Sequence, residues 1–322
     1  MRLFTKKFHL SAALAAAVAL MPALMPKAAQ ATDFLNILTG GTSGVYYPLG
    51  VGLAKIYSDA MPDAKVQVQS TKASVENLNL LQQGKGELAF ALGDSVKMAW
   101  DGDPEAGFKA KLDKLRGIAA IYPNYIQIVA SKDSGIKTLA DLRGKRVSVG
   151  APKSGTELNA RAILAAAGMS YKDLGQVQYL PFGESVDLMK NRQLDATLQS
   201  AGLGVSSIKD LSSSVAITMV AVPASVAEKL GAPYVAVDIP ANTYDGQTAA
   251  VPTVAVVNFL VTRAGVSDDM AYMMTKQLFE NLPKLEASHK AAAQISLKNA
   301  LKGMPIPLHP GAIKYYKEKG LM

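Results

Sequence analysis

The stretch GGTSGVYYPLG, residues 40–50, combines glycines and hydroxyl side chains in a way that could bind an anion or activate a nucleophile. It follows a strand-like segment, FLNILT, and precedes an apolar run that predicts a helix. Three kinds of site use a turn of this type: a phosphate-binding loop, the nucleophile elbow of a serine hydrolase, and a cradle for a small anion. The other chemistry-bearing residues of the chain decide among them.

A serine hydrolase is poorly supported by the residues available. A nucleophile elbow needs Gly-x-Ser-x-Gly, whereas GTSGV at 41–45 has its second glycine one position early. His9 falls in a leader segment, so only His289 and His309 remain as general bases, and both lie near the C-terminus. A Ser-His-acid triad therefore has no evident base.

Other catalytic and metal-binding patterns are also missing from the sequence. SGIK at 134–137 fits Ser-x-x-Lys but has no Lys-Thr-Gly partner, and the Gly-Lys pairs at 84–85 and 144–145 lack the Ser or Thr of a P-loop. Neither spaced histidines nor clustered carboxylates indicate a metal site. We therefore expect no enzyme activity, no metal and no cofactor.

The first 31 residues have the pattern of a cleaved export signal. Arg2, Lys6 and Lys7 precede the apolar stretch LSAALAAAVALMPALM, and AQA at 29–31 offers the small-x-small pattern of a cleavage site. Removing residues 1–31 also removes Lys27 and lowers the formal charge from +8 to +4. No later run is long and apolar enough to span a bilayer, so we expect a soluble protein in the periplasm.

The composition narrows the class of protein further. The chain has 322 residues, 49% of them hydrophobic, which is enough to build two domains. Its basic residues are scattered apart from KYYKEKG near the C-terminus, so a nucleic-acid partner is not expected. Cysteine is absent, which excludes disulfides, thiolate metal sites and a cysteine nucleophile. We expect a monomer stabilised by its core.

The order of elements predicts parallel sheets covered by helices. NLNLLQQGKGELAFAL indicates a helix end, a turn and a buried strand, and KLRGIAAIY and NYIQIVAS indicate two strands separated by a proline-containing turn. A second series predicts a short helix in TLADL, a turn at Gly144, a strand at 146–149 and a helix over about 155–167. Alternating strands and helices are typical of α/β proteins.

A weak internal repeat suggests two similar halves. SVENLNLLQQGKGELAFAL, from Ser74, matches SVDLMKNRQLDATLQS, from Ser185, in its order of helix, turn and strand. Any two helix-to-strand units look alike to some degree, so the match is equally compatible with chance. Two α/β lobes with a cleft between them would direct strand ends and helix N-termini at a ligand.

Three polar loops precede expected helices, and each would leave unpaired N–H groups and a partial positive charge facing a ligand. The helices are expected to begin near Val45, at Ser74 with that serine as the cap, and after Ser154, where Glu157 would complete a capping box. Such residues often cap helices without binding anything. Three such loops in an exported chain with no catalytic set favour a carboxylate-binding site. Its candidate residues are Thr42, Ser43, Tyr46, Ser70, Thr71, Ser154, Gly155 and Thr156.

Four stretches resemble the TAXI solute-binding proteins: ILTGGTSGVYYPLG, STKASVENLNLLQQGKGELAFALGD, VSVGAPKSGTE and NTYDGQTAAVPTVAV. These are the periplasmic receptors of one branch of the TRAP (tripartite ATP-independent periplasmic) transporters. The likeness runs from about Phe34 to the C-terminus. It implies an α/β, two-lobed type II periplasmic-binding-protein fold with a hinge and a ligand cleft between the lobes. It also implies a small carboxylate or amino-acid ligand, such as glutamate or 2-oxoglutarate, and TRAP permease subunits driven by an ion gradient.

Three further residues join the candidate site, and one departure affects it. Asp94 ends the second motif, and Gln199 lies where relatives often have a Gly-Pro element but this chain has QSAGLG. Tyr244 sits among turn residues in ANTYDGQ, with no evident core to join, and is expected to close the pocket together with Tyr46. Whether Lys72, Lys153 or Arg161 contacts the ligand stays open.

The expected domain layout follows from two long β-rich runs, YIQIVAS and PTVAVVNFLVTR, which are placed to cross between the lobes. After the signal at 1–31, residues 32–126 would form lobe I, residues 127–254 lobe II, and residues 255–322 would return to lobe I. Two alternatives remain: a binding protein of an ATP-driven importer or a sensor kinase, and a periplasmic serine hydrolase using Ser43 or Ser154.

Overall fold

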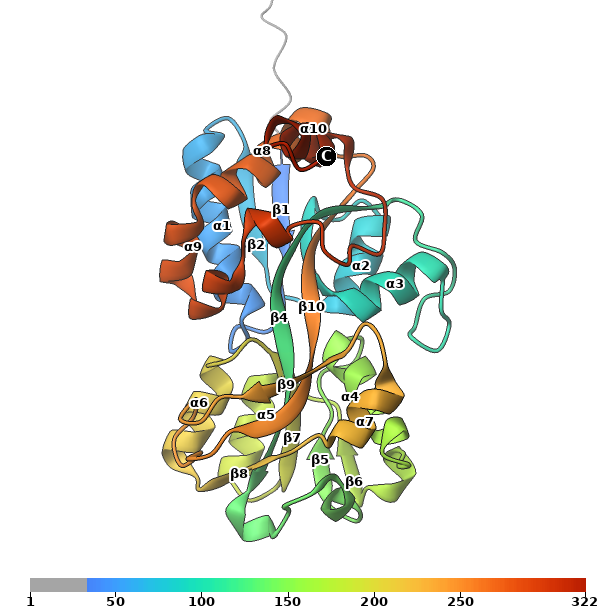
Figure 1. Ribbon diagram of the computed structural model, residues 1–322, viewed down its shortest axis with the longest axis vertical. Helices are drawn as coiled ribbons and strands as arrows, with labels where there is room; N and C mark the ends of the chain where they lie inside the picture. The colour runs from blue at the N-terminus through green and yellow to red at the C-terminus, as the bar shows by residue number, and fades with distance from the viewer. Residues whose placement is uncertain (1–33) are drawn as a thin grey trace, which may run out of the picture. The chain divides into compact units, whose positions relative to one another are not determined.

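Ten strands and the helices around them form the described part of the chain, residues 34–322 of a computed structural model (Figure 1). The export signal predicted at 1–31 lies outside the described residues. The elements form two groups, which we call lobe I and lobe II, and two long strands belong to both. No helix in residues 34–322 is long and apolar enough to cross a membrane.

Lobe I is built from segments at both ends of the described chain. Its elements are β1 (Phe34–Leu38), α1 (Tyr46–Ala60), β2 (Lys65–Gln69), α2 (Ser74–Gln82), β3 (Leu88–Leu92), α3 (Gly93–Asp101), α8 (Asp268–Glu280), α9 (Leu282–Ser288), η4 (Lys290–Gln294), η5 (Leu297–Asn299) and α10 (Pro310–Glu318). β1 pairs in parallel with β2 and with β3. The parallel strands and the helices between them confirm the α/β class expected from the sequence.

Lobe II repeats this arrangement with the middle of the chain. Its elements are η1 (Lys132–Ser134), η2 (Leu139–Leu142), β5 (Arg146–Ser148), α4 (Gly155–Ala166), η3 (Tyr171–Asp173), β6 (Gln176–Gln178), α5 (Phe182–Lys190), β7 (Ala196–Ala201), α6 (Ser206–Ser214), β8 (Ile217–Val220), α7 (Ala224–Leu230) and β9 (Val235–Ile239). β5 pairs in parallel with β6 and β7. The predicted turn at Gly144 is confirmed by its φ of 71°, and the predicted strand and helix that follow it are β5 and α4.

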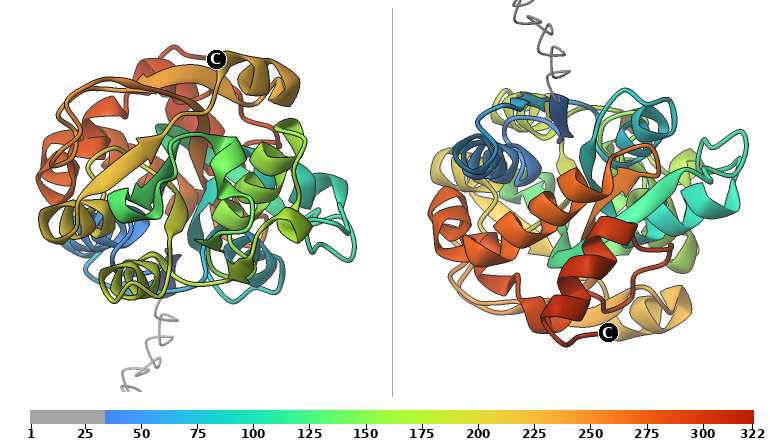
Figure 2. Two further views of the ribbon diagram at one scale, coloured as in Figure 1. Left: turned by 90° about the horizontal axis from the view of Figure 1, so that it is seen from below. Right: turned by 90° about the horizontal axis from the view of Figure 1, so that it is seen from above.

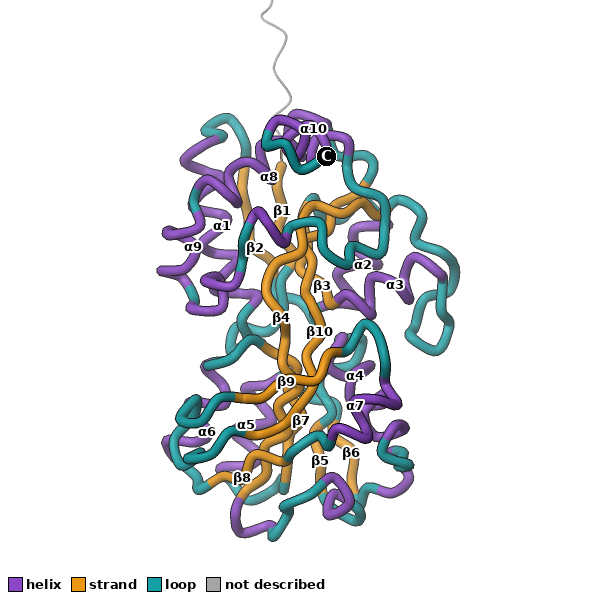
Figure 3. Tube along the Cα trace, in the orientation of Figure 1, coloured by secondary structure: helices purple, strands orange, loops and turns teal. Residues whose placement is uncertain are grey.

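Two long antiparallel strands, β4 (Leu115–Ser131) and β10 (Val251–Arg263), run through both lobes (Figures 1 and 3). The start of β10 pairs with β9 and its later part with β3, while the second half of β4 pairs with β7 and β8. The strands therefore form one hydrogen-bonded sheet in the order β2-β1-β3-β10-β4-β7-β5-β6, rather than separate sheets joined by two crossing strands. The end-on views in Figure 2 show helices on either side of these strands.

β4 corrects one prediction from the sequence. The two strands expected on either side of Pro123 are a single strand of 17 residues. Pro123 lies opposite Val257 of β10, and the register between the strands shifts between Val257 and Phe259. Proline has no N–H to donate, and an irregularity in the ladder is where a strand tolerates that loss. The chain therefore continues straight through the proline.

Candidate ligand-binding site

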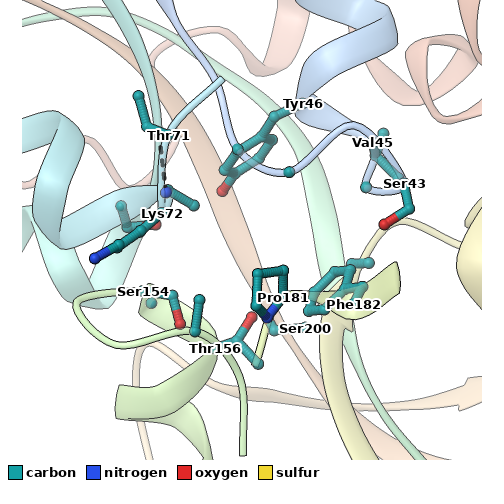
Figure 4. A pocket seen from close by; sticks show the side chains of 18 of the residues that line it. Ser43, Val45, Tyr46, Thr71, Lys72, Ser154, Thr156, Pro181, Phe182 and Ser200 are labelled. Atoms are coloured by element: carbon teal, nitrogen blue, oxygen red, sulfur yellow. Dashed lines mark hydrogen bonds between the residues drawn. The ribbon is translucent and has the colours of Figure 1, made fainter. Parts of the chain in front are cut away.

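A cavity of about 460 Å³ lies where the loops before four helices come together with β4 and β7. The four helices are α1 and α2 of lobe I and α4 and α5 of lobe II. Tyr122 and Asn124 on β4 and Ser200 and Ala201 on β7 also line the cavity. Figure 4 shows side chains from these loops and strands around the open space. The cavity therefore combines residues from both lobes and from a strand that connects them.

The structure brings eight of the eleven candidate residues to this cavity. They are Thr42, Ser43, Tyr46, Ser70, Thr71, Ser154, Gly155 and Thr156. The other three, Asp94, Gln199 and Tyr244, do not line it. Lining a cavity is a matter of position, and ligand contact by these eight residues stays a prediction.

The hydroxyls of Ser70 and Thr71 contact residues 39–44, the loop before α1 that we call the glycine loop. Ser70 Oγ donates to the carbonyl of Gly40 at 2.9 Å. Thr71 Oγ1 lies 2.9 Å from the carbonyl of Thr39 and 2.6 Å from Asn77 Oδ1, and either can accept its one proton. Thr71 Oγ1 also accepts from the amide of Ala73 at 3.0 Å. A Cβ on Gly40 would come within 3.3 Å of the Ala73 side chain, so glycine allows this close approach. These two hydroxyls are thus positioning groups for the loop.

The N-terminus of α2 differs from the prediction. Ser74 does not cap the helix: Ala73 occupies the cap position with a φ of 72° and makes no side-chain cap. Ser74 Oγ instead accepts from the amide of Leu92 at 3.1 Å, which ties α2 to the end of β3. The sequence pattern identified the start of the helix but not the residue that precedes it.

The N-terminus of α4 has half of the predicted capping box. Ser154 Oγ accepts from the amide of Glu157 at 3.1 Å, as a cap does. The Glu157 carboxylate does not return to the cap, because it bonds to Arg161 and to the hydroxyl of Tyr171, each at 2.8 Å. Arg161 is therefore paired along its own helix and does not line the cavity.

Residues at the starts of α1, α2, α4 and α5 line the cavity, where they bring backbone amides as well as side chains. The first amides of a helix have no partner within it, which leaves Gly155 and Thr156 of α4 as free donors. α1 and α5, unlike α4, begin without a side-chain cap. Each helix end carries a partial positive charge of about half a unit. Four such ends therefore favour a negative group in this cavity.

Charged side chains lie only at the margin. Within the described chain, the charged residues that line the cavity are Lys72, Glu184 and Asp187, and all three are exposed. Lys153 does not line it. Its carbonyl accepts instead from the amide of Glu76 at 3.1 Å, a bond from lobe I to lobe II. Among the described residues, none that lines the cavity is both charged and buried.

Tyr46 joins a buried network of amide side chains. Its hydroxyl donates to Asn258 Oδ1, and Asn258 Nδ2 donates to the carbonyl of Tyr122 at 2.8 Å and to Asn124 Oδ1 at 2.7 Å. Asn124 Nδ2 in turn donates to the carbonyl of Ser200 at 2.8 Å. Burial raises the pKa of the Tyr46 hydroxyl, so it stays a neutral donor. The network fixes β10, β4 and β7 around the cavity.

Asp94 connects the lobes beside the cavity instead of lining it. It is 3% exposed and accepts from Asn159 Nδ2 at 2.6 Å, from the Tyr234 hydroxyl at 2.7 Å and from the amide of Ser95 at 2.6 Å. Asn159 and Tyr234 belong to lobe II, and Asp94 to lobe I. Burial raises the pKa of the Asp94 carboxyl, and these donors oppose that rise. The second motif thus ends in a contact between the lobes.

Gln199 and Tyr244 lie in the protein interior. Gln199 is fully buried, with its Oε1 accepting from Ser207 Oγ at 2.6 Å. Tyr244 is 4% exposed; its hydroxyl donates to Gln127 Oε1 and accepts from the amide of Gly204 at 3.1 Å. The turn around Tyr244 is polar, but its tyrosine points inward. This differs from the expectation that Tyr244 has no core to join.

The two histidines of the described chain take structural positions. The His309 ring is buried; one nitrogen lies 3.0 Å from the carbonyl of Val266 and the other accepts from the amide of Gly311. His289 Nδ1 accepts from the amide of Ala291. Neither ring lines the cavity that contains Ser43 and Ser154. The serine hydrolase alternative thus lacks a histidine base at either serine.

Several cavity residues were not found from the sequence. Tyr122, Asn124 and Ser200 lie on buried strands, where polar residues give no local signal of a site. Pro181, which precedes α5, and the first turn of α5, residues 182–184, could have been found from the internal repeat, since Ser185 matches Ser74 and the residues just before Ser74 were selected.

The described chain has the two-lobed α/β fold of periplasmic binding proteins. It is similar to the periplasmic binding protein BugD, with a TM-score of 0.57 and 12% identity over 90% of this chain and 94% of that one. It is also similar to a binding protein component of an ABC phosphonate transporter from Pseudomonas aeruginosa, with a TM-score of 0.54 and 12% identity over 82% of this chain and 80% of that one. A third is the alkanesulfonate-binding protein SsuA from Xanthomonas axonopodis pv. citri bound to MOPS, with a TM-score of 0.50 and 17% identity over 89% of this chain and 93% of that one.

At these identities the structural similarities establish the fold and nothing finer. The sequence is more specific: residues 37–320 match the model of the NMT1-like family. That match covers most of the chain, and the protein belongs to the NMT1-like family.

Gly155→Val tests the close approach of the lobes at α4. A Cβ at Gly155 would lie 2.5 Å from Leu92 Cδ1 and 2.7 Å from Ser74 Oγ, both in lobe I, so valine would hold the lobes apart. We expect affinity for a carboxylate bound by the wild type to fall at least 100-fold, about 2.7 kcal/mol, by calorimetry. Small-angle scattering should show no compaction on adding that ligand. Wild-type affinity in a folded variant would contradict this account.

Asp94→Ala tests the contact between α3 and lobe II. Removing the carboxylate leaves the Tyr234 hydroxyl without its acceptor and leaves the Asn159 amide only the Tyr234 oxygen at 2.9 Å. We expect this loss to cost about 1–3 kcal/mol. Ligand affinity should fall about 10- to 100-fold in calorimetry. Asp101→Ala is the matched control, because Asp101 lies on the same helix, is half exposed and pairs only with Lys97. Equal affinities in the two variants would exclude a role for Asp94 in closure.

Proposed function

We propose that this protein is a periplasmic solute-binding protein that holds a small carboxylate, such as glutamate or 2-oxoglutarate, between its two lobes. The observation that carries this proposal is the meeting of four helix N-termini at one cavity. A helix end stabilises an anion by about 0.3–1 kcal/mol, so four together contribute about 2 kcal/mol. The cavity volume, about 460 Å³, suits a small molecule.

We propose further that the lobes close on the ligand as hinged bodies. The hinge would lie in β4 near residues 126–127 and in β10 near 254–255, which gives lobe I residues 32–126 and 255–322 and lobe II residues 127–254. The strand partners change near these points, because β10 pairs with β9 up to Ala255 and β4 pairs with β7 from Tyr125. The bonds from Glu76 to Lys153 and from Ser206 to Ser43 would break on opening.

The proposed partner is the membrane permease of a TRAP transporter, and the proposed location is the periplasm. The motif resemblance to TAXI receptors supports the permease, and the export-signal pattern at 1–31 supports the location. An ATP-driven importer is the second candidate, because one similar structure is named as part of an ABC transporter. Membrane vesicles prepared from cells that make this protein would distinguish them: uptake driven by an imposed ion gradient without ATP supports TRAP, and an ATP requirement supports the alternative.

Calorimetry with matched acids and amides tests the ligand class. Glutarate, 2-oxoglutarate and L-glutamate would be titrated into the protein after its ligand is removed by unfolding and refolding. We expect at least one acid to bind with a Kd below about 0.1 mM, and the uncharged diamide of the same skeleton to bind at least tenfold more weakly, because it loses the charge that the helix ends favour. Added salt should weaken the binding of the acid and leave the binding of the diamide unchanged.

Two results would contradict the proposal. One is failure of every acid to bind or to raise the melting temperature at about 1 mM, a concentration at which a 10 µM ligand stabilises by about 2.7 kcal/mol. The other is equal affinity for an acid and its diamide, which would leave the helix ends without a function in binding.

A further inference from the structure

Two hydroxyl groups at the cavity have no hydrogen-bond partner. In residues 34–322, the buried side-chain atoms without a partner include Tyr122 Oη and Ser200 Oγ, and these two belong to residues that line the cavity. Tyr122 is fully buried and Ser200 is 4% exposed. A buried hydroxyl left unpaired costs about 1–3 kcal/mol, so native proteins rarely retain one without a use.

The backbones of both residues are held firmly by the network around Asn258. The carbonyl of Tyr122 accepts from Asn258, and the carbonyl of Ser200 accepts from Asn124. The network thus occupies the main-chain acceptors of these residues and leaves their side-chain hydroxyls free. Tyr122 lies on β4 and Ser200 on β7, whereas the free amides of Gly155 and Thr156 belong to the first turn of α4. The cavity therefore has a second polar region, separate in origin from the helix ends.

The chemistry of this second region suits an uncharged group. A hydroxyl both donates and accepts, so each of the two can meet a carbonyl oxygen or another hydroxyl. The carboxylates that line the cavity, Glu184 and Asp187, are exposed side chains of α5, not neighbours on these strands. An ammonium group taken to Tyr122 and Ser200 would meet no buried carboxylate among the residues that line the cavity, because the buried Asp94 lies beside the cavity and already accepts three hydrogen bonds. An unpaired buried ammonium is costly.

We propose that Tyr122 and Ser200 bind an uncharged oxygen of the ligand, so that the protein selects oxo- or hydroxycarboxylates over unsubstituted carboxylates and amino acids. This inference rests on the proposed function, because it assumes that a carboxylate occupies the same cavity. It names Tyr122 and Ser200 as the residues that bind the oxo or hydroxyl group of the ligand, and it names the class of acid that they select.

Tyr122→Phe and Ser200→Ala test the assignment against a matched ligand set. The probes are 2-oxoglutarate, 2-hydroxyglutarate, L-glutamate and glutarate, which share one skeleton. The wild type should bind 2-oxoglutarate or 2-hydroxyglutarate at least tenfold more tightly than glutarate or L-glutamate. Each variant should lose about tenfold in affinity for the preferred oxygenated acid and keep its affinity for glutarate.

Stability gives a readout that a merely structural role would not produce. Removing an unpaired hydroxyl breaks no bond, so Tyr122→Phe should have an unchanged or higher melting temperature. Tyr57→Phe is the matched control: its buried hydroxyl donates to the carbonyl of Met274 at 3.1 Å, away from the cavity. That variant should melt at a lower temperature and bind all four acids as the wild type does.

The outcomes separate this inference from the proposed function. If the wild type binds no acid of the set, the carboxylate proposal fails and this inference fails with it. If the wild type binds the acids without preferring an oxygenated one, or if Tyr122→Phe and Ser200→Ala change the affinity for glutarate and 2-oxoglutarate equally, only this inference is overturned. A clear preference for L-glutamate would also overturn it.

Discussion

The antiparallel pairing of β4 with β10 is the constraint on which the rest of the structure depends. Each strand begins among the elements of one lobe and ends among those of the other, so the two lobes share a sheet. Their parallel strands therefore present the loops before α1 and α2 to the loops before α4 and α5. α/β sheets bind ligands at such strand ends, and here strand ends from both lobes of the one sheet face the same cavity. The cavity is a consequence of the shared strands.

The buried amide network makes this arrangement specific. Asn258 of β10 contacts Tyr46 of the glycine loop's helix and Asn124 of β4, and Asn124 continues to β7. Breaking one member would leave several buried groups without partners, each costing about 1–3 kcal/mol. A polar network at the point where two lobes meet also sets the positions of Tyr122 and Ser200. Tyr46 and Asn124 thus both line the cavity and belong to the network that joins the strands of the two lobes.

The sequence was informative where a short local pattern determines structure. GGTSG before an apolar run predicted the start of α1, and Ser154 three residues before Glu157 predicted the start of α4, since helix-breaking turns and helix caps depend on a few adjacent residues. It failed where the outcome depends on distant partners. Pro123 predicts a turn, but it lies within β4 because the pairing with β10 is irregular there. Tyr244 has no evident core to join in the sequence, but its hydroxyl donates to the buried Gln127. Asp94 has lobe II partners that no local pattern shows.

The central claim is that helix-end amides hold an anion in this cavity, and the amide resonances of Gly155 and Thr156 test it most directly. The measurement is a ¹⁵N–¹H correlation spectrum of the labelled protein during titration with the tightest-binding acid. The account predicts that both amide protons shift downfield with the saturation curve found by calorimetry, because a charged acceptor lengthens and polarises the N–H bond. Saturable binding that leaves both resonances in place would contradict it.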